Sequence, residues 1–567
     1  MIDQTIQNLR QEFDVISLVE LDHWHTFPYE QAQAWLDKQL RDLHRNEFNT
    51  QQRIIFVQRQ GDLYIKNNNV GLVIKNLQVA LNKVDISNFF VILISNNPAL
   101  DQELKILCTI STDPVPITGI YCHDEIYTPR FLDKHPTGNQ EIYQYGSPNP
   151  LKIDLNELTP QETFLLTKSS TFCMYPWIHL HAWPTGQAFP CCMSDPAGQV
   201  GDCRTQTLEE IWNNTPMKQL RKDMLNETPN KACTRCYEQE ESGFFSGRKS
   251  ANKHHGHLIS RAVETHPDGK LDRFEMIYWD IRFSNLCNLR CRSCGYIFSS
   301  QWHQDQSKLV GDDWGKKNPV LMYAGEHKTS MWEQLVPHLD YVEQIYFAGG
   351  EPLLMEEHYN ILDELDRRGR YDVRLIYNTN FTEIKLKDRT VFDYWKKFNS
   401  VAVGASLDAM GPRAEYIRKG TRWDEIERNR EQMLEICPLV DFYISPTLSI
   451  MNAWHLPDFH RNWVGRGFIK PQDLNVNILQ DPNYYRIDIA TSKYKKQLQE
   501  KFQDHLEWLR PQDRLNRATS GFESAIVFMN ATDNTHLIEK FWHKNLELDK
   551  IRKEDLLEIL PELKALE

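Results

Sequence analysis

The sequence lacks several features that would assign it to common classes of protein. It contains no apolar run of about 18 residues, so we expect no transmembrane helix. Its first residues contain neither the basic segment nor the apolar segment of a secretory signal. Residues 1–140 contain neither GxGxxG nor a P-loop, the two glycine patterns that cradle phosphates. These absences exclude membrane-spanning and secreted classes and give the N-terminal part no nucleotide-binding signature.

Positive charge is also scarce relative to negative charge. The formal net charge of −13 argues against broad binding to nucleic acids or anionic membranes. Twelve cysteines are present, and most of them cluster at spacings typical of metal ligands rather than of disulfides. A reducing, cytoplasmic location is therefore expected.

The length of 567 residues, with 41% hydrophobic residues, suits several domains. Strands are predicted at 53–57, 89–94 and 117–122, with a helix at 70–84, so the first domain is expected to be α/β. The predicted domains are an N-terminal α/β domain of unknown role (1–140), a small cysteine-rich domain (165–245), a core domain (271–485) and a helical C-terminal region (490–567).

Three cysteines, Cys287, Cys291 and Cys294, lie in one short segment with the spacing C-x3-C-x2-C. Thiolates are the usual protein ligands of iron–sulfur clusters, and three of them leave one iron of a cuboidal cluster without a protein ligand. A metal site that is short of one protein ligand is open to a substrate. Residues 277–283 alternate in polarity, which predicts a β-strand. The cysteines therefore follow a strand, where α/β barrels place their active sites.

The segments downstream repeat this arrangement of a strand followed by a polar or glycine-bearing turn. Predicted strands at 342–348, 373–377 and 401–405 end in GGEP, an asparagine-rich turn and S-x-D, respectively. The turn residues of interest are Gly349, Gly350, Glu351, Pro352, Asn378, Ser406 and Asp408, and Arg418 follows them. Glycines let the backbone approach a ligand closely, and a planar guanidinium suits a carboxylate.

Two more strands, at 441–448 and 474–479, complete a series of six between residues 277 and 479. Helical patterns such as 425–436 separate the strands, which predicts parallel β/α units. The predicted fold class is thus α/β, with a partial (β/α)6 barrel as the core domain.

Together, these motifs resemble the radical S-adenosylmethionine (SAM) superfamily. The resemblance implies that Cys287, Cys291 and Cys294 hold a [4Fe–4S] cluster whose open iron is chelated by SAM. It also implies a set of SAM-binding residues: Gly349, Gly350, Glu351, Pro352, Asn378, Ser406, Asp408 and Arg418. In this reading Arg418 pairs with the SAM carboxylate. Ser293 departs from the family, which has an aromatic residue before the third cysteine. A structural zinc site is the alternative, but it would need a fourth ligand nearby.

A second group of cysteines precedes this core. Its members are Cys173, Cys191, Cys192, Cys203, Cys233 and Cys236. A strand at 177–183, a turn and a returning segment at 187–190 predict a hairpin that presents two of these cysteines. A helix at 208–212 is expected to follow, with Thr207 as its N-cap.

The spacing of this group resembles SPASM and the shorter twitch domains, which hold auxiliary [4Fe–4S] clusters. The resemblance implies the ligands Cys173, Cys191, Cys233 and Cys236, with Cys192 as an alternative to Cys191. The absence of a further cysteine group favours twitch, and the position of the domain before the core is unusual. A zinc site with four cysteine ligands is the alternative. His179 and His181 share one strand face; we expect them to line the hairpin or contact substrate, and metal ligation is the other possibility.

The predicted function is that of a radical SAM enzyme, which cleaves SAM reductively to a 5′-deoxyadenosyl radical and abstracts hydrogen from a substrate. Relatives with auxiliary clusters often modify peptides or proteins, so a peptide is the leading substrate. A small molecule, such as a sugar, nucleoside or amino acid, is the enzymatic alternative. A metal-stabilised binding scaffold without catalysis is the alternative from another class. An electron donor such as a flavodoxin or ferredoxin is the expected partner, and no membrane partner is expected.

Overall fold

The computed structural model describes the backbone of five strands before residue 158, and then residues 158–241, 245–325, 330–513 and 515–566. The chain divides into two compact units, Met1–Asn149 and Pro150–Glu567. The first contains one sheet in the order β1-β2-β3-β4-β5. Its strands are β1 (Ile16–Glu20), β2 (Gln52–Gln58), β3 (Phe89–Ser95), β4 (Ile117–Cys122) and β5 (Glu125–Tyr127). The three strands predicted here are confirmed, and the helix predicted at 70–84 lies outside the described residues.

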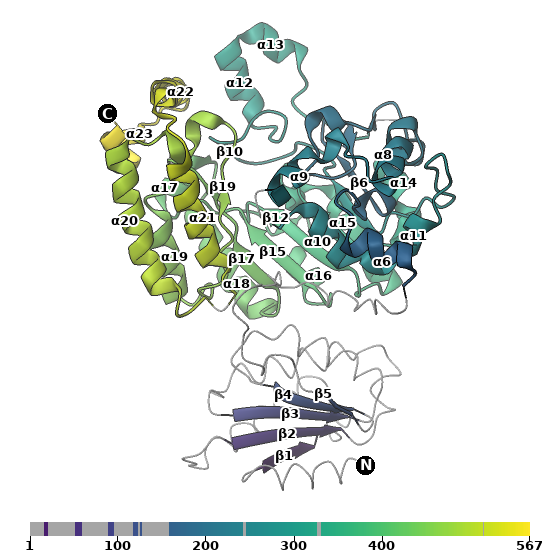
Figure 1. The fold of residues 1–567 in the computed structure, drawn as a ribbon. Helices are drawn as coiled ribbons and strands as arrows, with labels where there is room; N and C mark the ends of the chain where they lie inside the picture. The colour runs from purple at the N-terminus through teal and green to yellow at the C-terminus, as the bar shows by residue number, and fades with distance from the viewer. Residues whose placement is uncertain are drawn as a thin grey trace. The chain divides into compact units, whose positions relative to one another are not determined.

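The second unit is mixed α/β and is built on one eight-stranded sheet (Figure 1). The strand order is β17-β15-β12-β11-β9-β6-β7-β8. The first five of these are parallel: β9 (Tyr278–Ile281), β11 (Gln344–Phe347), β12 (Arg374–Thr379), β15 (Val401–Ala405) and β17 (Asp441–Ile444). A strand forms within each segment predicted from residue 277 to residue 448, but the one predicted at 441–448 is divided into β17 and a second strand in another sheet. The last predicted strand is reduced to β19 (Asn477–Ile478), which pairs with β18 (Thr447–Leu448) in a separate two-stranded sheet.

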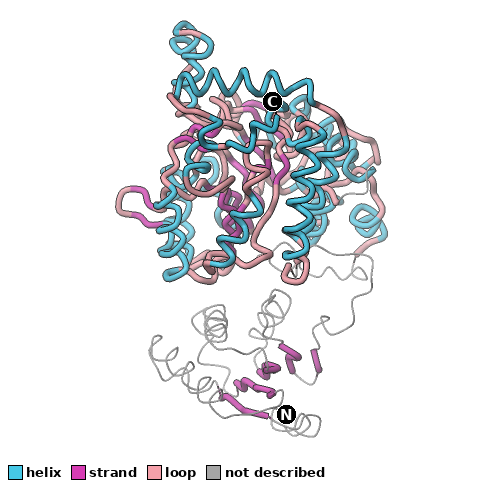
Figure 2. Tube along the Cα trace, turned by 90° about the vertical axis from the view of Figure 1, so that its left-hand side faces the viewer, coloured by secondary structure: helices cyan, strands magenta, loops and turns pink. Residues whose placement is uncertain are grey.

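Helices follow the strands in this unit and flank the sheet (Figure 2). They are α14 (Met331–Leu335), α15 (Glu356–Arg368), α16 (Val391–Trp395), α17 (Pro412–Ile417), α18 (Trp423–Ile436) and α19 (Leu456–Gly465). The sequence of α15 illustrates why they form, since it has acidic residues in its first turn, arginines in its last and the left-handed Gly369 as its cap. The helix predicted at 425–436 corresponds to α18.

The region of the upstream cysteines joins the same sheet. Its hairpin consists of β6 (His179–Ala182) and β7 (Gln187–Phe189), followed by β8 (Gly201–Asp202). Strand β6 pairs in parallel with β9, from His179 opposite Tyr278 to Ala182 opposite Ile281. The predicted strand at 177–183 is shorter than expected because a 3-10 turn, Tyr175–Trp177, occupies its start.

Short helices enclose the hairpin. They are α6 (Pro160–Thr167), α7 (Leu208–Trp212), α8 (Thr215–Leu225), α9 (Thr234–Glu241), α10 (Gly247–His255) and α11 (Ser260–Val263). Helix α7 begins at the predicted N-cap, Thr207, which forms a capping box with Glu210. Buried Trp177, Trp212 and Trp279 belong to one hydrophobic cluster, so the hairpin region and the sheet share a core.

Two further segments complete the unit. Residues 295–325 carry α12 (Trp302–Val310) and α13 (Asp312–Lys317), and the C-terminal region carries α20 (Ser492–Leu509), α21 (Arg517–Ala531), α22 (Ile538–Arg552) and α23 (Leu556–Ile559). The helical character predicted for the C-terminal region is confirmed. None of the helices in the described residues is long and apolar enough to cross a membrane.

Candidate functional site

A cavity of about 740 Å³ opens at the carboxyl edge of the parallel strands. Many of the predicted site residues line it: Cys287, Cys291, Cys294, Gly349, Gly350, Asn378, Ser406 and Arg418. These residues come from the segments after β9, β11, β12 and β15, because the carboxyl ends of parallel strands meet at one edge. Glu351, Pro352 and Asp408, also predicted from sequence, are buried behind the wall rather than among the lining residues.

The cysteine loop, residues 287–294, is held by hydrogen bonds to its backbone. The indole Nε1 of Trp302 donates to the Cys291 carbonyl at 2.8 Å, and the Ser299 hydroxyl donates to the Leu289 carbonyl at 2.5 Å. Residues Arg290–Cys291 also pair with Arg418–Lys419 in a short antiparallel ladder. Cys287 and Cys291 are buried, and Cys294 is half-buried against them. Three thiols are thereby fixed on one side of the cavity.

Burial determines the protonation of these thiols in the free chain. It raises the pKa of Cys294 to about 12 and raises the pKa of Cys287 further. It also raises the pKa of Cys291, and the nearby Arg418 guanidinium opposes that rise. Metal ligation requires thiolates, so binding an iron cluster here would release protons. Three thiols on the wall of one cavity are a donor set that suits a cluster with one open corner.

The GGEP turn packs directly on the cysteine loop. A Cβ at Gly350 would lie 2.1 Å from the Leu286 carbonyl oxygen, so only glycine fits there. Glu351 donates its backbone N–H to the same carbonyl at 2.7 Å. Its carboxylate accepts from the Thr379 hydroxyl and from the Asn380 N–H, both at 2.7 Å. Burial nevertheless raises the pKa of Glu351 to about 7. Glu351 thus connects the end of β12 to the GGEP turn by hydrogen bonds.

Arg418 lies between the cysteine loop and a carboxylate. Its Nε and Nη2 donate to Asp408 at 2.8 and 3.1 Å, and its Nη1 lies 3.6 Å from the Cys291 sulfur. Asp408 also accepts from the Thr447 N–H at 2.8 Å. The arginine predicted to bind the SAM carboxylate and Asp408, also predicted to bind SAM, are thus paired with each other. Asn378 donates to the Tyr346 hydroxyl at 2.5 Å, while Ser406 lines the cavity.

The upstream group, Cys173, Cys191, Cys233 and Cys236, forms a second cluster of thiols. The charge of each of Cys173, Cys233 and Cys236 raises the pKa of another member, after the larger effect of burial, so each of the four thiols lies within electrostatic reach of at least one other. Cys192 is hydrogen-bonded to Asp280 and lies near Arg282, a residue of the cavity wall. Its charge also raises the pKa of Cys191, so the two neighbouring thiols lie close together.

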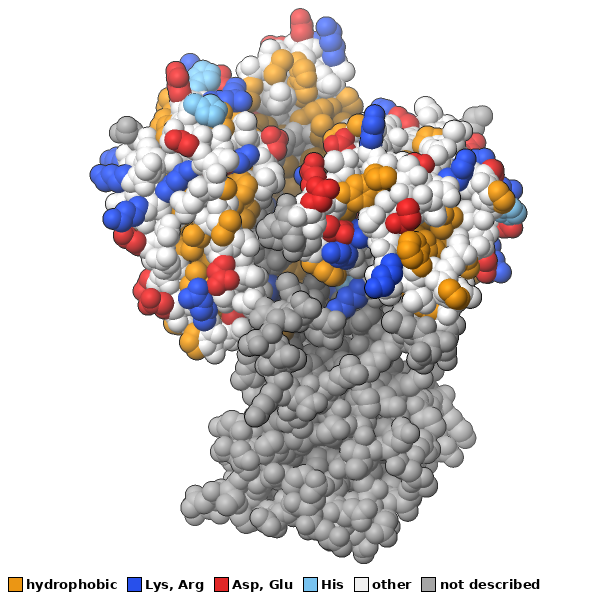
Figure 3. Space-filling view, in the orientation of Figure 1, with side chains coloured by type: hydrophobic (Ala, Val, Ile, Leu, Met, Phe, Trp, Pro, Cys, Tyr) orange, Lys and Arg blue, Asp and Glu red, His pale blue; other side chains and the backbone are white. Residues whose placement is uncertain are grey.

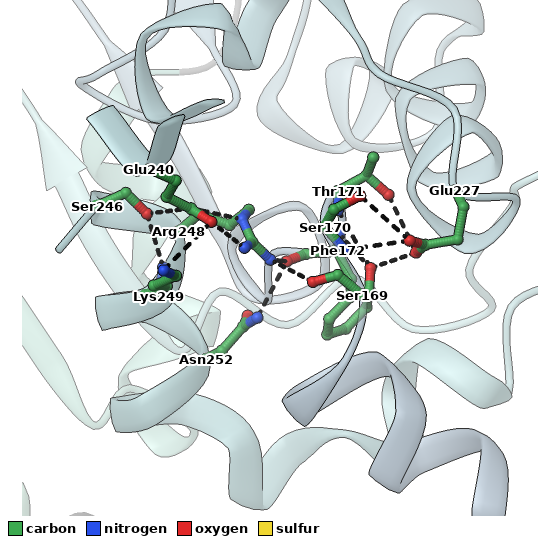
Figure 4. A network of polar contacts seen from close by, with 10 residues as sticks. All are labelled: Ser169, Ser170, Thr171, Phe172, Glu227, Glu240, Ser246, Arg248, Lys249 and Asn252. Atoms are coloured by element: carbon green, nitrogen blue, oxygen red, sulfur yellow. Dashed lines mark hydrogen bonds and ion pairs between the residues drawn. The ribbon is translucent and has the colours of Figure 1, made fainter. Parts of the chain in front are cut away.

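A polar network fixes the chain around Cys173 (Figure 4). Arg248 of α10 donates to the carbonyls of Ser169 and Phe172 at 3.0 and 2.9 Å. Its Nε also donates to Glu240 of α9 at 2.9 Å, which ties the Cys173 segment to the helix that carries Cys236. Asn252 accepts from the Met174 N–H at 2.9 Å. The upstream group thus has a rigid support of its own.

His179 and His181 are buried, and both Nδ1 atoms contact β9. They lie 3.0 Å from the backbone oxygens of Tyr278 and Asp280, respectively. His181 is also 3.0 Å from the Asp280 carboxylate, whose pKa is held well below its usual range by His181 and Arg282 despite its burial. These histidines connect the hairpin to β9.

Among the described residues, no three His, Cys, Asp or Glu side chains converge on the position of a single metal ion. One zinc ion draws its sulfurs to about 2.3 Å from a common centre. A cuboidal cluster holds its ligands on separate irons and spreads them farther apart. The described cysteines as placed therefore match no single-ion site.

One comparison with known proteins identifies part of the chain. Residues 173–237 match the SPASM iron–sulfur cluster-binding domain. This SPASM region contains all four cysteines of the upstream group, and the match supports iron–sulfur binding there. Domains of this kind occur in radical SAM proteins. No curated protein matches the chain.

Sequence reasoning missed several residues around the cavity. Arg282, Gln306, Trp314 and Thr447 line it, and Arg292 anchors the cysteine loop from behind. Only Arg282 carried a signal, because it is a charged residue in the strand predicted at 277–283. The others come from segments whose approach to the site depends on tertiary packing.

Proposed function

We propose that the chain is a radical SAM enzyme with an auxiliary iron–sulfur cluster in its SPASM region. The observation that carries the proposal is the convergence of three thiols, a glycine-rich turn and Arg418 on one cavity, beside a SPASM region. In this proposal, residues 271–485 form a partial barrel, and residues 1–140 and 490–567 lie outside the catalytic core. A cavity of about 740 Å³ is within the usual range for a cofactor together with a substrate.

The residues present suit the proposed cofactors. Cys287, Cys291 and Cys294 would hold a [4Fe–4S] cluster, and SAM bound at its open iron supplies, on reduction, a 5′-deoxyadenosyl radical that abstracts hydrogen. The backbone of Gly349 and Gly350 and the side chains of Asn378 and Ser406 border the space for SAM. Arg418 must share its guanidinium between Asp408 and a SAM carboxylate. Cys173, Cys191, Cys233 and Cys236 would hold the auxiliary [4Fe–4S] cluster.

A peptide or protein is the substrate that we favour. The segment 295–325 contributes Gln306 and Trp314 to the cavity. It also exposes apolar side chains: Ile297, Val310, Val320, Leu321 and Tyr323. Figure 3 shows hydrophobic side chains gathered over this end of the molecule. Exposed apolar surface beside a site suits a large partner. A small molecule is the second candidate, favoured by the enclosed part of the cavity.

The decisive test is anaerobic reconstitution with iron and sulfide, followed by SAM and a strong reductant. We expect the wild type to form 5′-deoxyadenosine, which is detected by liquid chromatography. We also expect product when a reduced flavodoxin or ferredoxin is used in place of the chemical reductant. If no product formed and elemental analysis found zinc instead of iron, the protein would be a metal-stabilised scaffold and not a radical SAM enzyme.

A further inference from the structure

The cysteine loop contains a buried arginine that contacts neither the cavity nor a predicted ligand. Arg292 lies directly after Cys291, and its side chain is 0% exposed. Its guanidinium forms an ion pair with Asp549, a second one with Glu554 at 2.8 Å and a hydrogen bond to the Asn545 amide oxygen at 3.0 Å. All three partners belong to α22 and the turn that follows it. A fully buried guanidinium requires such partners, because an unpaired charge is costly there.

The other side of Arg292 faces the core. Its guanidinium carbon lies 3.8 Å from the centre of the Tyr416 ring, and its backbone N–H donates to the Ile417 carbonyl at 2.8 Å. The Tyr416 hydroxyl donates to Asp549 at 2.9 Å. Glu554 also pairs with Lys419 at 2.8 Å. The arginine is therefore enclosed by groups that fix its orientation from several directions.

A second contact reaches the loop on the other side of Cys291. Arg290 pairs with Asp305 of α12 at 2.9 Å, and Arg552 of α22 pairs with the other oxygen of Asp305 at 2.8 Å. Arg552 also stacks on the ring of Trp302, whose indole holds the Cys291 carbonyl. Arg292 thus contacts α22 directly, and Arg290 is connected to α22 through Asp305.

We propose that residues 545–554 act as a clamp that positions Cys291, and that Arg292 and Asp549 are its central positioning residues. The clamp would keep the loop cysteines at the spacing that an iron–sulfur cluster requires before any iron binds. This deepens the proposed function, since the cluster it serves is the one proposed at the cysteine loop. The C-terminal region then contributes to the site without touching the cavity.

The test uses the full chain with Asp549→Asn, which removes one charge that Arg292 needs. We expect the iron content of the reconstituted protein to fall by about half, because the auxiliary cluster stays. The electron paramagnetic resonance (EPR) signal that responds to SAM should disappear, and in the apoprotein Cys291 should be alkylated several-fold faster, as measured by mass spectrometry. Arg292→Lys keeps the charge but loses the planar fork, so it should show the same changes in weaker form.

Two controls separate positioning from general stability. Glu562→Gln breaks the ion pair of the C-terminal region with Arg413 and does not touch the loop, so it should retain full iron and the SAM-responsive signal. Glu240→Gln removes the partner of Arg248 and should lower only the auxiliary cluster. Circular dichroism shows whether Asp549→Asn folds. If it does not, Glu554→Gln is used instead, because the Glu554 carboxylate lies at the edge of the buried ion pair between Arg292 and Asp549.

The clamp would be overturned if Asp549→Asn had the iron content, EPR spectrum and Cys291 alkylation rate of the wild type. The same result in Glu554→Gln would overturn it where that variant replaces Asp549→Asn. This result differs from failure of the proposed function, in which the wild type itself forms no SAM-responsive cluster. The alkylation rate of Cys291 in the apoprotein still tests the clamp in that case.

Discussion

Each of the two cysteine groups is supported by an arginine that pairs with a carboxylate. The two arginines differ in how far along the chain that carboxylate lies. Arg248 fixes the segment of Cys173 and pairs with Glu240, eight residues away. Arg292 fixes the segment of Cys291 and pairs with Asp549, 257 residues away. The upstream cysteines are therefore supported by residues nearby in the chain, while the cysteine loop depends on the end of the chain. The loop also lines a cavity, and the described lining of that cavity includes none of the four upstream cysteines.

The comparison predicts unequal losses when a cysteine is removed from each group. Cys291→Ala should abolish 5′-deoxyadenosine formation, because the open cluster cannot form with two thiolates. Cys236→Ala should lower the iron content but spare part of the SAM cleavage. Both are measured by product chromatography and iron analysis after anaerobic reconstitution. A Cys236→Ala protein with wild-type activity and iron would show that Cys236 is not a ligand.

A matched pair of glycines sharpens the comparison without touching a cysteine. Gly350→Ala places a Cβ 2.1 Å from the Leu286 carbonyl oxygen, so the turn and the cysteine loop must separate. We expect it to lose about half of the iron. Gly247→Ala, next to the upstream group, meets only ordinary contacts, the nearer at 3.5 Å, and should keep all of it. Equal iron in the two variants would contradict the close packing of turn and loop.

Arg418 gives a smaller, specific effect. Arg418→Gln removes charge-assisted hydrogen bonds worth about 1.5–3 kcal/mol each, so we expect SAM to bind about tenfold more weakly, which corresponds to about 1.4 kcal/mol. Equilibrium dialysis with labelled SAM measures this. The matched control is Arg430→Gln, a buried arginine that donates to the Phe468 carbonyl away from the cavity. Unchanged affinity in Arg418→Gln would exclude a role for this arginine in binding the SAM carboxylate.

The smallest effect is expected at Cys192. Cys192→Ser should leave the iron content unchanged, because its thiol is hydrogen-bonded to Asp280 and Cys191 is the proposed ligand. Cys191→Ser should lose the auxiliary cluster. Iron analysis and EPR of the SAM-free protein distinguish the two variants. The opposite result would assign the ligand to Cys192.

The sequence was informative where the signal is local. Alternating polarity located β9, and Thr207 located the start of α7. The residues brought to the cavity from four strand ends could also be predicted, because parallel strands present their carboxyl ends together. The sixth strand was overestimated, since it contains only the two-residue strand Asn477–Ile478 and an isolated bridge from Leu474 to Ile444.

The parts that could not be predicted depend on long-range packing. Nothing local to β6 indicates that it pairs with β9, and nothing near Arg292 indicates Asp549 as its partner. The mutual pairing of Arg418 and Asp408 is similar. Each residue matched a family position by itself, but their 2.8 Å contact arises only when the two turns meet.

The parallel ladder between β6 and β9 constrains any attempt to exchange the auxiliary module. A chimera that replaces residues 173–237 must supply a strand in the register of His179–Ala182 against Tyr278–Ile281. Without that strand, the backbone donors and acceptors of β9 are left open to another polypeptide, a recognised route to aggregation. Backbone hydrogen bonds between β6 and β9 join this region to the sheet. Any replacement has to preserve that strand pairing, and a covalent linker alone is not enough.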